Sequence, residues 1–128
     1  MPLEKKIATI LIIDDDIHYL KVMIHHLQRL HYKVLAAPSA ASGKQMALLE
    51  RPDLILMDLS MPFMDGIIAI HDLKADQTLA TIPIIVVSGH NSLDFLERAR
   101  AAGCDDYEVK PVNYLELASK IERLRLSA

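Results

Sequence analysis

The sequence has 128 residues, a length that fits one domain with room for a hydrophobic core. Hydrophobic residues make up 52% of it and charged residues 24%, which excludes a disordered or fibrous chain. The net charge is −3 without a dense run of Lys or Arg, the apolar runs are short, and Cys104 is the single cysteine. These features argue against a nucleic-acid-binding domain, a membrane protein and a disulfide framework, and we expect one cytoplasmic domain over residues 1–128.

The first half of the chain predicts two units in which a strand precedes a helix. Ala8–Ile13 is a short apolar run, and apolar residues at helical spacing follow it from Ile17 to Leu27. Val34–Ala37 is a shorter, more mixed strand. The helix over Ala40–Glu50 has the weakest signal, because Gly43 lies inside it at a cost of about 1 kcal/mol relative to Ala.

The second half continues the same alternation. Leu54–Met57 and Ile82–Val87 are apolar on consecutive residues, as strands covered on both faces must be, whereas Asp106–Val109 is short and mixed. A stripe of apolar residues at helical spacing follows each of these strands. The stripes are Ile67, Ile70 and Leu73; Phe95, Ala99 and Ala102; and Tyr114, Leu117, Ile121 and Leu124.

Strand and helix alternating five times predict an α/β fold in which helices cover both faces of a parallel sheet. The first, third and fourth strands are the most apolar, so we expect them in the middle of the sheet. The mixed second and fifth strands suit the edges. This favours a flavodoxin-like, doubly wound sheet of five parallel strands in the order 2-1-3-4-5, with five helices.

Polar residues directly follow four of the predicted strands, at the edge where open parallel sheets bind their ligands. Each has a structural explanation when it is taken alone, and Asp16 in particular suits the N-cap of the first helix. Their position at one edge makes a functional site the stronger interpretation. The residues are Asp14, Asp15 and Asp16 after the first strand, Asp58 after the third, Ser88 after the fourth and Lys110 at the end of the fifth.

Clustered carboxylates at this edge point to a metal ion. Two carboxylates about 4 Å apart repel by on the order of 4 kcal/mol at an effective dielectric constant near 20, so a proton or a cation must join them. A site whose ligands are all oxygen atoms suits a hard divalent cation, above all Mg²⁺. Asp58 could then act as a nucleophile toward phosphorus and form an acyl phosphate. Lys110 and Ser88 would contact the phosphoryl oxygens.

Four motifs resemble the receiver domain of two-component response regulators, a family that includes the single-domain chemotaxis regulators. They are ILIIDDD at 10–16, LILMDLSMPFMDG at 54–66, IPIIVVSG at 82–89 and GCDDYEVKP at 103–111. The resemblance covers essentially the whole chain. Val112 and Ala40 depart from residues that are common in the family, and neither touches the inferred chemistry.

The resemblance implies that Asp58 is the phosphoacceptor in a magnesium site, with Mn²⁺ as an alternative ion. Asp15 and Asp58 would bind the metal directly, together with the backbone carbonyl of Ser60, and Asp14 would act through water. Ser88 and Lys110 would contact the phosphoryl group. The Lys110–Pro111 peptide bond would be cis.

The same resemblance implies a switch. Ser88 would turn toward the phosphoryl group, and Tyr107 would rotate from an exposed to a buried position. This would change the surface of the fourth helix, fifth strand and fifth helix. Ser60 and His90 would tune the lifetime of the acyl phosphate.

The implied function is that of a phosphoacceptor signalling switch in a two-component phosphorelay. A histidine kinase or histidine phosphotransfer protein would supply the phosphoryl group, and a downstream protein or fused output domain would respond. The resemblance leaves room for a homodimer on phosphorylation, and it implies no binding to nucleic acid or membrane. The chain would catalyse only its own phosphorylation and dephosphorylation.

Two other functions remain open on the sequence. A metal-dependent phosphohydrolase with an aspartyl nucleophile usually has a second acid two residues beyond that nucleophile, where this chain has Ser60. A receiver-like binding module that never takes a phosphoryl group would have no need for the set Asp15, Asp58, Ser88 and Lys110.

Ser60 and His90 lie two residues beyond Asp58 and Ser88, so both should flank the mouth of the site. Substituting both side chains is expected to change the rate of autodephosphorylation, because the resemblance implies that side chains at these two positions admit or block the attacking water. Decay of the phosphorylated protein, followed by intact mass, measures that rate, and far-UV circular dichroism checks the fold. Equal lifetimes in the wild type and the double variant would contradict the assignment.

Overall fold

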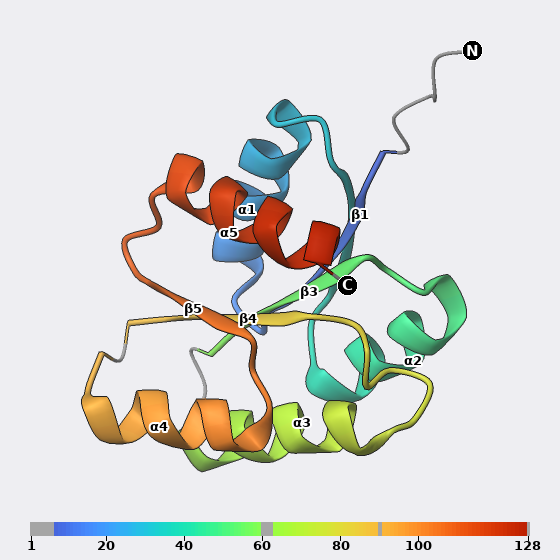
Figure 1. Cartoon of the computed structure of the whole chain (residues 1–128). Coiled ribbons are helices and arrows are strands. Elements are labelled where there is room, and N and C mark those ends of the chain that lie inside the picture. Colours follow the sequence, from blue (N-terminus) through green and yellow to red (C-terminus); the bar gives the residue numbers. More distant parts are fainter. Residues whose placement is uncertain (1–6, 60–62, 90, 128) are drawn as a thin grey trace.

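The computed structural model describes residues 7–59, 63–89 and 91–127, and five strands alternate with five helices over these ranges (Figure 1). The strands are β1 (Thr9–Ile13), β2 (Lys33–Ala37), β3 (Leu54–Asp58), β4 (Ile84–Ser88) and β5 (Asp106–Val109). The helices are α1 (Ile17–Arg29), α2 (Ala40–Glu50), α3 (Phe63–Ala75), α4 (Leu93–Ala102) and α5 (Tyr114–Ser127).

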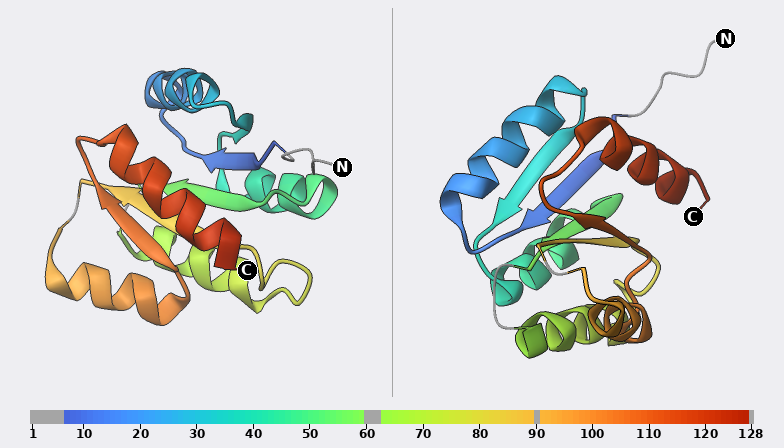
Figure 2. Two further views of the ribbon diagram at one scale, coloured as in Figure 1. Left: turned by 45° about the horizontal axis from the view of Figure 1, so that its top comes forward. Right: turned by 90° about the vertical axis from the view of Figure 1, so that its left-hand side faces the viewer.

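All neighbouring strands pair in parallel, and their order is β2-β1-β3-β4-β5. This confirms the fold and the strand order predicted from the sequence. Helices α1 and α5 cover one face of the sheet, and α2, α3 and α4 cover the other (Figures 1 and 2). No helix within the described ranges is both long and apolar enough to cross a membrane.

The core has two layers, one on each face of the sheet, because successive side chains of a strand point to opposite faces. In β1, Ile10 and Ile12 belong to the layer under α1 and α5, whereas Leu11 and Ile13 belong to the layer under α2, α3 and α4. The middle strands β3 and β4 are buried along their whole length. Their carboxyl ends are therefore held firmly in place.

Helix α2 forms despite Gly43, and its packing against β1 explains the glycine. A Cβ atom added at Gly43 would lie 2.4 Å from Cδ1 of Ile13, so the missing side chain lets the helix approach the strand closely. A capping box at the start of α2 offsets part of the low helix propensity of Gly43, because the side chains of Ser39 and Ser42 each accept a hydrogen bond from the backbone N–H of the other residue. The weak helical signal thus reflects a packing requirement.

The ends of the other helices follow the sequence signals. Asp16 caps α1, since its Oδ1 accepts a hydrogen bond from the backbone N–H of His18 at 3.0 Å. Asn113 caps α5 through the N–H of Glu116 at 3.1 Å. Gly103 ends α4 in the left-handed conformation, with φ 118°. Cys104 follows as a buried thiol, and burial raises its pKa to about 11.

The burial of β3 makes a stability prediction possible. Leu56 is fully buried in this central strand, so Leu56→Ala is expected to lower the free energy of unfolding by about 2–5 kcal/mol through lost burial and a cavity. Urea denaturation measures the change. The control is Leu115→Ala on α5, where the side chain is 77% exposed and the expected change stays within about 0.5 kcal/mol. Equal losses at the two positions would contradict the described core.

Candidate phosphoacceptor site

The sheet brings the predicted polar residues to its carboxyl edge. Asp58 lies beside Val87 at the ends of β3 and β4, and Ser88 lies beside Val109 at the ends of β4 and β5. Backbone hydrogen bonds continue the ladder past the strand ends, because the Lys110 N–H donates to the carbonyl of Ser88 at 2.9 Å. Residues far apart in the sequence therefore share one edge through the register of the strands.

Lys110 and Asp58 form an ion pair. The Lys110 Nζ lies 2.8 Å from Oδ1 of Asp58, and the Asp58 side chain is fully buried while that of Lys110 is 22% exposed. A buried carboxylate without a compensating charge is strongly destabilising. The ammonium group therefore makes an ionised Asp58 tolerable inside the fold.

Three buried carboxylate oxygens at this edge have no hydrogen-bond partner among the described residues, namely Oδ2 of Asp14 and both oxygens of Asp58. Because Oδ1 of Asp58 has the ion pair with Lys110, Oδ2 of Asp14 and Oδ2 of Asp58 are the two that lack a charged partner among these residues as well. The other oxygen of Asp14 accepts a hydrogen bond from the backbone N–H of Asp16 at 2.9 Å. Buried acceptors are costly when they are left unpaired, and a divalent cation is a suitable partner for two such oxygens. The donor set therefore fits Mg²⁺.

The electrostatics of the two acids agree with this interpretation. Burial raises the pKa of Asp14 to about 7, and the nearby Asp58 carboxylate adds to the increase, while the hydrogen bond from Asp16 opposes it. Burial also raises the pKa of Asp58, and the ammonium group of Lys110 opposes this effect. Negative charge on Asp58 thus disfavours ionisation of Asp14, and negative charge on Asp15 disfavours ionisation of Asp58, so a bound cation would favour the ionised form of both buried acids.

The remaining predicted metal ligands are less well defined. Asp15 is exposed, yet its charge is near enough to raise the pKa of Asp58. Within residues 7–59, 63–89 and 91–127, no three His, Cys, Asp or Glu side chains form a ready metal cluster. Ser60 and His90 lie outside these ranges. The complete ligand set of Asp15, Asp58 and Ser60 stays a prediction.

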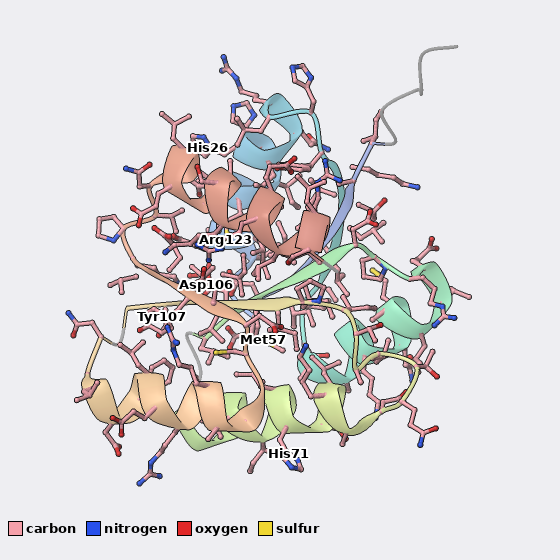
Figure 3. All side chains as sticks on the ribbon, viewed as in Figure 1. His26, Met57, His71, Asp106, Tyr107 and Arg123 are labelled. Atoms are coloured by element: carbon pink, nitrogen blue, oxygen red, sulfur yellow. The ribbon has the colours of Figure 1, made fainter. Side chains whose placement is uncertain are left out.

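Ser88 and Tyr107 occupy the interior at this end of the sheet. Ser88 is fully buried, and its hydroxyl donates a long hydrogen bond of 3.4 Å to the carbonyl of Leu59. Tyr107, labelled in Figure 3, is only 8% exposed and lies on the side of the sheet covered by α3 and α4. Its ring packs edge-to-face against Phe95 at a centroid distance of 5.9 Å. The predicted exposed starting position of Tyr107 is therefore wrong, because Phe95 already provides a buried site for the ring.

Sequence reasoning missed one residue of the site, Tyr19. The Lys110 Nζ lies 3.9 Å from the centroid of the Tyr19 ring, within the range of a cation–π interaction. Tyr19 stands on the first turn of α1, directly after Asp14 to Asp16, so its position in the chain does place it at this edge. Helical periodicity gave no indication of its partner, which comes from the far end of the sequence.

The Lys110–Pro111 peptide bond is cis, as the resemblance to receiver domains implied. The sequence from 10 to 122 matches the family model described as "Response regulator receiver domain". The chain belongs to this family. Receiver domains are the phosphoacceptor signalling domains of two-component systems, so the predicted resemblance is confirmed.

Relatives and solved structures agree with the family. The transcriptional regulatory protein PrrA of Mycobacterium tuberculosis is 32% identical over 115 residues, which are 90% of this chain and 48% of that protein. The chain thus spans about half the length of the curated relatives it matches. The chemotaxis protein CheY4 of Vibrio cholerae has a TM-score of 0.85 at 26% identity, covering 93% of this chain and 99% of that one.

A third comparison bears on the metal. The receiver domain of the sensor histidine kinase PA1611 from Pseudomonas aeruginosa has a TM-score of 0.83 at 28% identity, covering 94% of this chain and 98% of that one. That structure is described with a magnesium ion coordinated in its active site cleft. The receiver fold thus accepts Mg²⁺ in this relative.

The buried, unpaired Oδ2 of Asp14 leads to a stability prediction for metal-free buffer. In the folded chain the pKa of Asp14 is about 7, against an ordinary value of 3.8, so the folded state binds more protons between these pH values. The free energy of unfolding must then fall as pH rises across this window. At pH 8 with a chelator, Asp14→Asn is expected to be about 1–3 kcal/mol more stable than the wild type, as measured by urea denaturation.

The control for this experiment is Asp94→Asn, because the Asp94 side chain is 70% exposed and its ion pair with Arg98 is superficial. Millimolar Mg²⁺ should raise the free energy of unfolding of the wild type and so reduce the difference in this quantity between Asp14→Asn and the wild type. A wild type that is more stable than Asp14→Asn in the chelator would contradict the described burial of this carboxylate.

Proposed function

We propose that Asp58 of this receiver domain accepts a phosphoryl group from the phosphohistidine of a histidine kinase or phosphotransfer protein. The observation that carries the proposal is the environment of Asp58. One oxygen is ion-paired with Lys110 at 2.8 Å, and the other is buried without a hydrogen-bond partner beside Asp14. A carboxylate in this position has one oxygen that is electrostatically supported and one that is open to new bonds.

The transfer forms one bond and breaks one. An Asp58 carboxylate oxygen attacks the phosphorus, and the P–N bond of the donor breaks as the imidazole leaves with its electron pair, so the product is an acyl phosphate. The Lys110 ammonium group, already beside the attacking carboxylate, supplies positive charge to a phosphoryl oxygen. Burial of Asp58 keeps competing water away from the reacting atoms.

The unpaired oxygens support a magnesium site built from Asp15, Asp58 and the backbone carbonyl of Ser60, with Asp14 acting through water. When bound, Mg²⁺, or Mn²⁺ in its place, neutralises negative charge on the phosphoryl oxygens. Asp14 and Asp58 cannot easily both stay ionised without such a cation, since burial raises both of their pKa values. The need for a metal therefore follows from the same burial that protects the acyl phosphate.

A signal would then start from Ser88. Its hydroxyl donates a long hydrogen bond of 3.4 Å to the Leu59 carbonyl, and a charged phosphoryl oxygen is a stronger acceptor than a carbonyl. Because Tyr107 is already buried against Phe95, phosphorylation would stabilise the inward ring and not create it. The surface of α4, β5 and α5 would carry the change to its partners.

The partners follow from the family and belong to the proposal. They are a kinase or phosphotransfer protein upstream, and a target protein, a fused output domain or a second phosphorylated copy downstream. We place residues 1–128 in one receiver domain that acts in the cytoplasm. We also propose that it has no other substrate, because the acid that aspartyl phosphohydrolases usually carry two residues after the nucleophile is here Ser60.

Incubation with a small phosphodonor and Mg²⁺ tests the proposal. The intact mass of the wild type is expected to increase by about 80 Da, because a single aspartyl phosphate forms, and this species should persist for minutes. Asp58→Asn should remove the gain, since an amide oxygen is a poor nucleophile. Asp94→Asn, which changes a 70% exposed acid in the first turn of α4, should keep it.

The same experiment separates the alternatives. Steady release of phosphate from small esters, without a persistent mass change, would support a phosphohydrolase. No mass gain at any Mg²⁺ concentration, from a small donor or a phosphorylated histidine kinase, would support a binding module that takes no phosphoryl group.

A further inference from the structure

The environment of Lys110 contains a contact that the proposed chemistry does not require. Its ammonium group has two described partners, the Asp58 carboxylate at 2.8 Å and the face of the Tyr19 ring at 3.9 Å from the centroid. These partners come from β3 and α1, so the lysine is held between a strand and a helix. A lysine side chain has a flexible four-carbon stem, and one ion pair alone leaves it several conformations.

Tyr19 is itself firmly placed. Its backbone N–H donates to Oδ1 of the N-cap Asp16 at 3.3 Å, which fixes the first turn of α1. The side chain is half-buried against the apolar layer under α1 and α5. Burial, followed by the nearby Tyr114 and Asp58, raises the pKa of Tyr19 to about 12, so the phenol stays neutral near pH 7. The ring is thus an ordered, uncharged surface.

We propose that Tyr19 is a positioning residue for phosphoryl transfer, whose ring face holds the Lys110 ammonium group at the Asp58 carboxylate. The inference rests on the proposed function of the same site. Aromatic faces attract ammonium groups through their quadrupole, and an interaction of this kind corresponds to about a 2- to 30-fold effect on a rate or an equilibrium. Tyr19 acts through Lys110 and forms no bond to the phosphoryl group.

This role differs from simple packing, because it depends on the aromatic ring and not on side-chain volume. Phenylalanine keeps the ring face and loses only the hydroxyl, whereas leucine keeps an apolar side chain without the quadrupole. Tyr114 offers a matched control on α5. It is close to Tyr19 and packs on the same apolar layer, but its ring stacks on His26 at a centroid distance of 4.0 Å.

The rate test compares Tyr19→Leu, Tyr19→Phe and Tyr114→Leu with the wild type, using a small phosphodonor at saturating Mg²⁺. We expect Tyr19→Leu to lower the maximal phosphorylation rate about 2- to 30-fold, while the other two variants stay within about twofold. Mg²⁺ affinity should not weaken in Tyr19→Leu, because the acidic ligands are intact. Equal rates in Tyr19→Leu and the wild type, or equal losses in Tyr19→Leu and Tyr114→Leu, would overturn the proposal.

A nuclear magnetic resonance measurement tests the contact directly and needs no activity. The ε-methylene protons of Lys110 should be shifted upfield by the ring current of Tyr19 in the wild type and in Tyr19→Phe, and the shift should disappear in Tyr19→Leu. An unshifted Lys110 in the folded wild type would overturn the proposal even if Tyr19→Leu failed to fold.

The two tests also distinguish this proposal from the proposed function. A wild type that takes no phosphoryl group but shows the Lys110 ring-current shift would contradict the phosphoacceptor role and leave the contact intact. A wild type that is phosphorylated on Asp58 without dependence on Tyr19 would contradict the positioning role alone.

Discussion

Two carboxylates buried beside one ammonium group set the constraint on which this site depends. Asp14 and Asp58 are each only 1% exposed, and Lys110 offsets one of the two charges. One negative charge therefore stays uncompensated, and carboxylate oxygens stay without hydrogen-bond partners in the interior. Such oxygens are costly there because the local dielectric constant is low. The apo site is therefore held at an electrostatic cost, and a cation or a phosphoryl group with its metal relieves that cost. Relief of this cost contributes favourably to the free energy of binding the cation.

The sheet makes this imbalance sustainable. Strands β3 and β4 are buried along their length and pair in register, so the ends that carry Asp58 and Ser88 cannot move apart to relieve repulsion. Helix α1 begins three residues after Asp14, and its N-cap Asp16 holds the intervening turn. The chemistry thus lies on rigid strand ends, while the parts that respond to a phosphoryl group are side chains and the segments that follow.

Much of this arrangement was predictable from the sequence. Consecutive apolar residues in ILII, LILM and IIVV identify strands that are covered on both faces, and this pattern predicts that they lie in the middle of the sheet. Because the strands are parallel, the residues that follow them are then expected at one edge of the sheet. The contact between Tyr19 and Lys110 was not predictable, because periodicity assigns a residue to a face but does not name a partner from another element. The buried ring of Tyr107 on β5 depends on Phe95, which is twelve residues earlier on helix α4. Gly43 weakens the predicted helix, and the sequence could not show why it is there: α2 packs so closely on the side chain of Ile13 that a Cβ atom would not fit.

Cys104 has a practical consequence for spectroscopy. Its thiol is buried, and because its pKa is about 11, very little thiolate exists near neutral pH. A cysteine introduced on an exposed helix surface would react with a maleimide or spin label far faster than the native thiol. Pairs of fluorophores or nitroxides on α4 and α5 could then report distance changes between these helices in a background that keeps every native residue except the two labelled ones.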